Sequence, residues 1–221
     1  MYNEEILEKF AKVPVFSLSD VSQIVPNRDY AKKVIRRLVE RKKIMRVKKD
    51  LYTRHKDAFL IATYICRPSY ISGASALSYH QMTTQLPHEI FCMTSKITRK
   101  YSFIEKITFH HTKQFFGFET EDYLGFKIHV ASPEKAIIDS VGHTPLAAIE
   151  DAFNEIDVTR MLAYIKKIKK SSIAKRMGYI LESRGHNVFP ELRGLLNKKY
   201  IFLDPLAKNK TEKNKKWGLI L

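Results

Sequence analysis

The pattern of apolar and polar residues predicts three short helices in the first forty residues of the chain. Residues 6–11 place their apolar side chains on one helical face, and Val13 ends this helix because the residue before a proline avoids helical backbone angles. Ser17 and Asp20 form a capping-box pattern at the start of a second, short helix. Asn27 is a suitable N-cap for the third helix.

The third helix has the clearest amphipathic pattern, because its apolar residues recur at i, i+3, i+4, i+7 and i+8. These residues are Ala31, Val34, Ile35, Leu38 and Val39. After it, residues 44–47 and 51–53 are typical of two short strands joined by a turn at residues 48–50. Three helices followed by a hairpin with a basic tip is the element order of a winged helix-turn-helix domain, which we place at residues 1–56.

Residues 57–221 predict a second domain of mixed α and β structure, with its helices mostly late. The pattern favours a helix from Asp57 to Arg67 and strands over residues 90–94, 107–111 and 126–130. Ser132, as an N-cap followed by Pro133, begins a further helix that Gly142 ends. Helical patterns run over residues 146–184, and a last short strand over 200–203. The expected fold class is therefore α+β.

Charge is the compositional feature that bears most on function. The chain has a net charge of +16, and residues 28–56 alone carry thirteen basic residues against three acidic ones. A second basic zone begins at Arg160, since no acidic residue lies between Asp157 and Glu182, and five lysines form a third in the tail at residues 208–216. Such an excess favours polyanionic partners. The change of character near residue 57 places a domain boundary at 55–58.

Double-stranded DNA is the partner that this charge distribution favours, because a helix with outward basic residues fits the major groove. A merely solvated helix face, or one that docks another protein, is the alternative. The residues expected to enter the groove are Arg28, Tyr30, Lys33, Arg36 and Arg37. The residues of the hairpin expected to contact phosphates are Arg46, Lys48 and Lys49. The residues expected on a basic face of the second domain are Lys166, Lys167, Lys169, Lys170, Lys175 and Arg176.

Motifs of enzymes and cofactor sites are absent from the sequence. It contains no phosphate-binding glycine loop, no metalloprotease motif and no nucleophile elbow, so we expect no cofactor and no metal. A metal-dependent nuclease remains an alternative, since scattered carboxylates beside basic residues can hold metals near a phosphate. Its candidate acids are Glu119, Glu121 and Asp122, which we expect in a surface loop, and Asp139.

Cellular location follows from two further features. Cys66 and Cys92 lie in apolar surroundings, which is typical of reduced, buried cysteines in cytosolic proteins. The longest apolar stretch, residues 59–65, is far shorter than a membrane span of roughly 20 residues, and the acidic N-terminus does not resemble a signal peptide. We therefore expect a cytoplasmic protein without a membrane partner.

Two segments give the chain a resemblance to a known family. The segment at residues 70–77 reads Tyr-Ile-Ser-Gly-Ala-Ser-Ala-Leu, and the segment at 130–139 reads Val-Ala-Ser-Pro-Glu-Lys-Ala-Ile-Ile-Asp. Together with the basic N-terminal domain, they make residues 5–185 similar to the AbiEi-type antitoxins of bacteria and archaea. This resemblance implies a two-domain regulator that represses its own operon through the N-terminal domain. It also implies that the second domain neutralises a nucleotidyltransferase-type toxin without a stable complex, as in type IV toxin–antitoxin systems.

Combining the resemblance with the charge pattern, we expect the protein to bind an inverted repeat in its own promoter. It would be a monomer in solution or two copies on the repeat. A winged-helix regulator without antitoxin activity is the main alternative.

Overall fold

The chain folds into two compact units of mixed α and β structure. The computed structural model describes residues 2–207 and 211–221, so residues 208–210 of the expected basic tail lie outside the described residues. The first unit comprises Met1–Ile71, His88–Thr112 and Thr120–His129, and the second comprises Ser72–Pro87, Lys113–Glu119 and Val130–Leu221. The boundary that the composition predicts at residues 55–58 therefore lies within the first unit.

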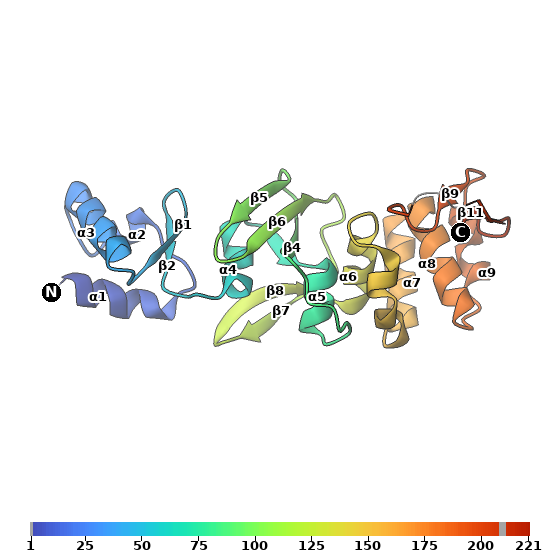
Figure 1. Cartoon of the computed structure of the whole chain (residues 1–221), viewed down its shortest axis with the longest axis horizontal. Coiled ribbons are helices and arrows are strands. Elements are labelled where there is room, and N and C mark those ends of the chain that lie inside the picture. Colours follow the sequence, from blue (N-terminus) through green and yellow to red (C-terminus); the bar gives the residue numbers. More distant parts are fainter. Residues whose placement is uncertain (1, 208–210) are drawn as a thin grey trace. The chain divides into compact units, whose positions relative to one another are not determined.

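Helices and a hairpin form the N-terminal part of the first unit (Figure 1). The helices are α1 (Tyr2–Lys9), η1 (Phe10–Lys12), α2 (Leu18–Ser22) and α3 (Arg28–Glu40). The hairpin pairs β1 (Met45–Lys48) with β2 (Leu51–Thr53) in antiparallel register, with an irregularity between Arg46 and Lys48.

Local capping explains where these helices begin. The Ser17 hydroxyl accepts from the amide of Asp20 at 3.2 Å, while the Asp20 carboxylate accepts from the amide of Ser17 at 2.7 Å. Oδ1 of Asn27 accepts from the amides of Asp29 and Tyr30, both at 2.9 Å. Each cap satisfies amide groups that have no partner within the helix.

A single apolar core holds the three helices together. It includes Ile6 of α1, Val21 of α2 and Ile35 of α3, and the Phe10 and Phe16 rings stack at 4.2 Å between centroids. The backbone of Phe16 exchanges two hydrogen bonds with that of Tyr52, at 2.8 and 2.9 Å. The hairpin is therefore fixed to the helical core.

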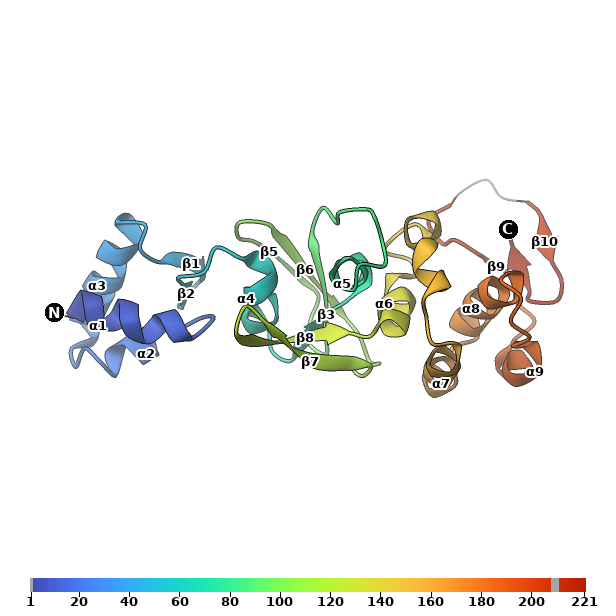
Figure 2. The ribbon, with the colours of Figure 1, turned by 90° about the horizontal axis from the view of Figure 1, so that it is seen from below.

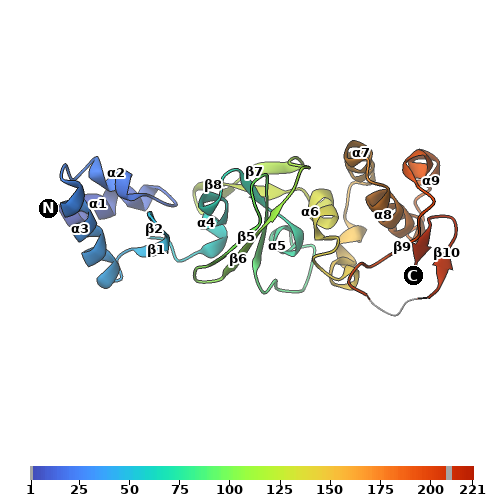
Figure 3. The same cartoon turned by 90° about the horizontal axis from the view of Figure 1, so that it is seen from above.

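A six-stranded sheet has residues of all its strands in the first unit, with the order β5-β6-β4-β3-β8-β7. Its strands are β3 (Ser69–Ile71), β4 (Ile90–Thr94), β5 (Arg99–Ser102), β6 (Lys106–His111), β7 (Phe118–Tyr123) and β8 (Phe126–Ala131). β4 and β6 are parallel, whereas β3 runs antiparallel to β4 and β5 runs antiparallel to β6. Helix α4 (Ala58–Ile65) packs against β3 and β4. Figure 3 shows α4 beside this sheet.

Helices make up most of the regular secondary structure of the second unit. Its longer helices are α5 (Gly73–Tyr79), α6 (Pro133–Ser140), α7 (Val158–Ile168) and α8 (Ser171–Ser183). Shorter ones are η2 (Leu146–Ile149), η3 (Asp151–Asn154), α9 (Phe189–Leu192) and η4 (Arg193–Leu195). α5 packs against α6, and α8 packs against both α7 and α9 (Figure 2). A small sheet of order β10-β11-β9 closes the unit, from Ile201–Phe202 (β9), Lys213–Asn214 (β10) and Leu219–Ile220 (β11).

The mixed α and β character and the late helices agree with the sequence, and two local predictions need correction. Residues 119–122 lie in strand β7 and not in a surface loop, because Leu124 and Gly125, both at positive φ, turn the chain back into β8. The strands β5, β10 and β11 were not predicted. In the described part of the chain, no helix is long and apolar enough to cross a membrane.

Candidate nucleic-acid interface

The outward face of α3 presents the predicted groove-entering residues to solvent. Ala31, Val34, Ile35 and Leu38 bury the opposite face in the core. The exposed positions are Arg28, Tyr30, Lys33, Arg36 and Arg37, and Tyr30 has 41% of its surface accessible. The helical period therefore places these five side chains as the sequence predicts.

Two ion pairs lie along this face of α3. Lys32 pairs with Asp29 at 2.9 Å, and Nε of Arg36 pairs with Oε1 of Glu40 at 2.8 Å. The hydrogen bond from Lys32 and its charge lower the pKa of the Asp29 carboxyl. Exposed pairs of this kind contribute little to stability, so a phosphate can displace them. Within the described residues, Arg28, Lys33 and Arg37 take part in no ion pair.

The hairpin presents two of its three predicted phosphate-contacting residues to solvent. Arg46 on β1 and Lys49 in the turn are exposed. Lys48 is half-buried, and its ammonium donates to the carbonyl oxygen of Ile65 at 2.5 Å. The Lys48 side chain thus extends toward the C-terminal end of α4.

A groove between α3 and the hairpin joins the two predicted sets of residues. Arg36 of α3 and Arg46 of β1 both line it, over an apolar floor that includes Leu18 and Ile35. The structure therefore brings one predicted groove-entering residue and one predicted phosphate-contacting residue to the same surface.

Three exposed basic residues between α3 and β1 were not selected from the sequence. Arg41, Lys42 and Lys43 follow the last turn of α3, and Lys42 has a positive φ of 55°. Their place in the basic window is the signal that could have identified them. They extend the positive surface of α3 toward the hairpin.

The basic face predicted for the second unit is smaller than expected. Lys166, Lys167, Lys169 and Lys170 are exposed around the junction of α7 and α8. Lys166 pairs with Glu191 at 2.5 Å, and the Lys167 ammonium lies 4.1 Å from the ring centroid of Phe116.

Lys175 and Arg176 do not lie on this face, and their prediction as surface residues was wrong. They are 1% and 9% exposed, because α8 is covered along most of its length. The Lys175 ammonium donates to Oδ1 of Asn197 at 2.9 Å and to the carbonyl of Lys199. Nε of Arg176 donates to the carbonyls of Phe202 and Leu203, each at 3.0 Å. Burial lowers the pKa of both groups, and for Arg176 the charge of Asp204 opposes this shift.

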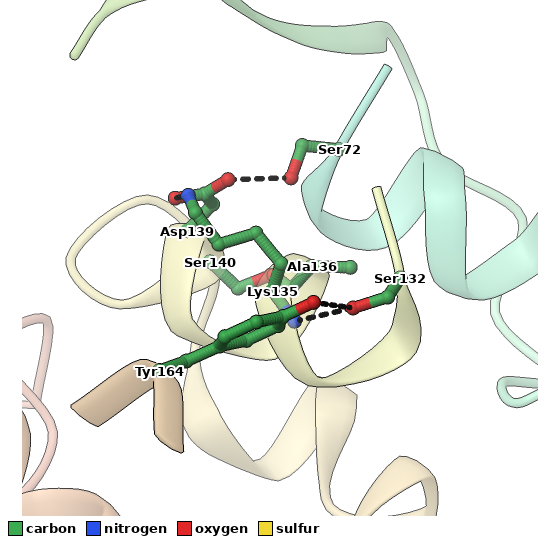
Figure 4. A network of polar contacts seen from close by, with 7 residues as sticks. All are labelled: Ser72, Ser132, Lys135, Ala136, Asp139, Ser140 and Tyr164. Carbon is green, nitrogen blue, oxygen red and sulfur yellow. Dashed lines mark hydrogen bonds and ion pairs between the residues drawn. The ribbon is translucent and has the colours of Figure 1, made fainter. Parts of the chain in front are cut away.

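A buried polar cluster joins α6 to the start of α5 (Figure 4). Asp139 accepts from the Ser72 hydroxyl at 2.8 Å through Oδ2, and its Oδ1 pairs with the Lys135 ammonium. Ser132, the N-cap of α6, lies 3.5 Å from the Tyr164 hydroxyl. Burial lowers the pKa of Lys135, whereas Asp139 opposes the shift. Because both oxygens of Asp139 already have partners, this cluster is arranged to hold two elements together.

Metal-binding and thiol chemistry have few candidate groups. Among residues 2–207 and 211–221, no group of three or more His, Cys, Asp or Glu side chains is arranged to hold a metal ion. Cys66 and Cys92 are free cysteines, and burial raises the pKa of the Cys92 thiol.

Comparison with solved structures shows a similarity of fold. No family model and no curated protein matches the chain. Among solved structures, the fold is similar to the crystal structure of the RV2827C protein from Mycobacterium tuberculosis, with a TM-score of 0.70 and 12% sequence identity. The match covers 99% of this chain and 90% of that protein. At this identity the similarity concerns the fold alone.

Proposed function

We propose that this protein is a DNA-binding transcriptional regulator whose residues 1–56 form a winged helix-turn-helix. In this proposal α3 is the recognition helix and the β1–β2 hairpin is the wing. One observation carries it: α3 buries one face in a core and presents exposed cations, including Arg28, Lys33 and Arg37, on the other. A rigid helix with such a face fits the major groove, and basic side chains on a hairpin can reach the flanking phosphates.

Fluorescence anisotropy tests this proposal with the DNA upstream of the protein's own gene and a scrambled duplex of the same composition. Binding to the upstream DNA should outlast binding to the scrambled duplex as the salt concentration rises, because base contacts add a salt-insensitive contribution. Equal, salt-sensitive binding to both duplexes would contradict sequence-specific regulation.

Variants separate the two predicted roles. Lys33→Ala, Arg37→Ala or Tyr30→Ala should reduce binding to the upstream DNA more than to the scrambled duplex. Lys49→Ala should weaken binding to both and reduce the salt slope by about 1, as for a phosphate contact. Lys12→Ala on η1 is the matched control, since Lys12 is also exposed but lies outside α3 and the hairpin. Equal losses on both duplexes for the α3 variants would count against α3 as the recognition helix.

We extend the proposal to the antitoxin and autorepressor of a type IV toxin–antitoxin operon. The protein would bind an inverted repeat in its promoter as two copies and neutralise a nucleotidyltransferase-type toxin. Support comes from the resemblance of residues 70–77 and 130–139 to AbiEi-type antitoxins and from the contact of these segments at Asp139. Co-expression with the adjacent gene product is the test: a toxic neighbour that this chain does not neutralise would leave a regulator without antitoxin activity.

A further inference from the structure

A second basic groove lies in the first unit, apart from the outward face of α3. It has a volume of about 540 Å³, within the range of ligand-binding clefts. Four cationic side chains and two tyrosines line it, and its lining contains no acidic residue: Lys48, Arg67, Lys96, Arg99, Tyr64 and Tyr101. They come from the hairpin, from α4 and the segment that follows it, from the connection between β4 and β5, and from β5.

The four cations are not neutralised by the protein. Within the described residues, none of them forms an ion pair with a carboxylate. Arg67, Lys96 and Arg99 are exposed. Because four like charges gathered in one groove repel each other, the groove favours an anionic ligand that carries several charges along its length.

The two tyrosines hold cations in place. The Arg67 guanidinium lies 4.5 Å from the ring centroid of Tyr64, and the Lys48 ammonium lies 5.8 Å from that of Tyr101. The Tyr64 hydroxyl is itself bound to the carbonyl of Lys127. Cation–π contacts of this kind order long side chains before a ligand arrives, which reduces the entropy lost on binding. Since a cation already lies over each ring, the groove is better suited to phosphates than to stacked bases.

We propose that this groove binds the sugar-phosphate backbone of DNA that flanks the segment read by α3. The inference rests on the proposed function, because Lys48 belongs to the hairpin that carries Arg46 and Lys49. A duplex engaged by the hairpin is thereby offered a second row of cations on the same unit. The contact is independent of base sequence and lengthens the DNA segment that the protein covers.

The test compares the double variant Lys96→Gln/Arg99→Gln with Lys100→Gln. Lys100 is a matched control, because it is exposed on β5 between Arg99 and Tyr101 and strand alternation points it to the other face. Footprinting with the unmodified protein first locates its site in the DNA upstream of its gene. Affinity is then measured by anisotropy on a short duplex of about two helical turns and on one extended by about one turn at each end.

The double variant should bind the extended duplex about tenfold more weakly at roughly 0.15 M salt, with a salt slope lower by about 2, and bind the short duplex as the unmodified protein does. Lys100→Gln should leave the extended duplex unaffected. In ethylation interference, ethylation of the flanking phosphates should weaken binding of the unmodified protein but not of the double variant. Ethylation of phosphates in the central site should weaken binding of both proteins. Circular dichroism melting verifies that each variant is folded.

The outcomes separate this inference from the proposed function. If the affinity and the salt slope of Lys96→Gln/Arg99→Gln are unchanged, the groove does not bind DNA. The proposal that α3 is the recognition helix would be unaffected. If the unmodified protein binds upstream and scrambled DNA equally, the proposed function fails. In that case the difference in salt slope between the double variant and Lys100→Gln still shows whether the groove contacts DNA phosphates. Absence of all DNA binding would overturn both.

Discussion

The hydroxyl of Ser72 donates a hydrogen bond of 2.8 Å to Oδ2 of Asp139, 67 residues further along the chain. Oδ1 of the same carboxylate pairs with Lys135 one turn earlier on α6, and all three side chains are buried (Figure 4). The contact joins residues 70–77 and 130–139, the two segments on which the proposed relationship to AbiEi-type antitoxins rests. Ser72 and Asp139 therefore have a structural role, which is to hold the start of α5 against α6.

Removing either partner of this contact should destabilise the second unit by different amounts. Asp139→Ala leaves the Lys135 ammonium buried without its counter-charge, so the free energy of unfolding should fall by about 3–5 kcal/mol. Ser72→Ala removes one hydrogen bond to a carboxylate that keeps its lysine, so the loss should be about 1–3 kcal/mol. Urea unfolding followed by circular dichroism measures both.

Ser78→Ala is the control for these variants, because Ser78 lies on the same helix α5 and is half-buried. It should change the free energy of unfolding by less than about 0.5 kcal/mol, as is usual away from buried contacts. An Asp139→Ala protein as stable as Ser78→Ala would show that the buried ion pair contributes nothing.

Helix starts were predictable from the sequence because capping is local. Ser17, Asn27 and Ser132 each cap the helix that follows them, through bonds to amides two or three residues away. The same holds for the exposed face of α3, since helical periodicity alone separates its buried residues from its charged ones. None of these features depends on what a distant part of the chain does.

The two edge strands of the six-stranded sheet were harder to predict. β5 and β7 lie at the ends of the strand order, and most of their residues are exposed or half-buried. A strand that needs only one partner can carry charge at most positions, and charged edges also oppose aggregation. Such strands lack the apolar alternation that identifies a strand in sequence, so Arg99 could not be assigned to the basic groove.

The burial of Lys175 on helix α8 was also not predictable from the sequence. Its charge suggested a surface, but residues 197–203 and Trp217 come from far along the chain to cover α8. Whether a lysine is exposed depends on this tertiary packing, which a count of basic residues does not contain.

Gly178 of α8 should be intolerant of alanine, although alanine normally stabilises a helix by about 1 kcal/mol relative to glycine. A Cβ at Gly178 would lie 2.3 Å from two ring atoms of Trp217, whose side chain is 1% exposed. The ring must move, so Gly178→Ala should unfold at lower urea and shift the fluorescence of Trp217, the single tryptophan of the chain. Gly194→Ala is the control, because no atom beyond its chain neighbours and the local helix backbone lies within 4 Å of its added Cβ. Equal stability of the two variants would contradict the close packing.

Lys175→Gln should lower stability without weakening DNA binding. The shorter, neutral side chain loses the ammonium contacts with Asn197 and the carbonyl of Lys199, which become poorly satisfied. Lys170→Gln is the matched variant, since Lys170 is exposed at the start of the same helix and should leave the melting temperature unchanged. Thermal melting and anisotropy on the same preparations separate the two effects. If a folded Lys175→Gln protein bound DNA more weakly than the unmodified protein, Lys175 would take part in DNA binding.

Glu40→Gln should strengthen DNA binding. The carboxylate of Glu40 lies on the α3 face that would meet the DNA and holds Nε of Arg36 at 2.8 Å. Removing its charge reduces repulsion with the phosphates and frees the guanidinium, so affinity should rise about threefold to tenfold at low salt and converge with that of the unmodified protein at high salt. Glu5→Gln on α1 removes the same charge from another exposed position and should have a smaller effect. If both variants gained the same affinity, the gain would come from the net charge of the protein and not from the position of Glu40 on α3.

Acid should loosen the C-terminal strands through Glu182. Its carboxylate accepts from the Trp217 indole at 2.8 Å and pairs with Lys216 at 2.5 Å. Burial acts to raise the pKa of Glu182. The hydrogen bonds from Lys216 and Trp217 outweigh this effect, so the pKa of Glu182 is below its ordinary value of 4.5. A carboxyl whose pKa is lower in the folded state stabilises the fold above its unfolded pKa, and this contribution disappears as the pH falls through the folded pKa. Stability from this contact should therefore be constant from pH 7 to about 5 and decline below about 4.5.

Trp217 fluorescence during acid titration measures this decline directly. Glu182→Gln cannot be protonated in this range, so it should remove the Trp217 transition below pH 4.5 while already showing a more exposed indole at pH 7. Glu191→Gln is the control, because Glu191 pairs with Lys166 in the same unit but has no bond to Trp217. A Trp217 transition that persists in Glu182→Gln would assign the acid sensitivity of the C-terminal strands to another carboxyl.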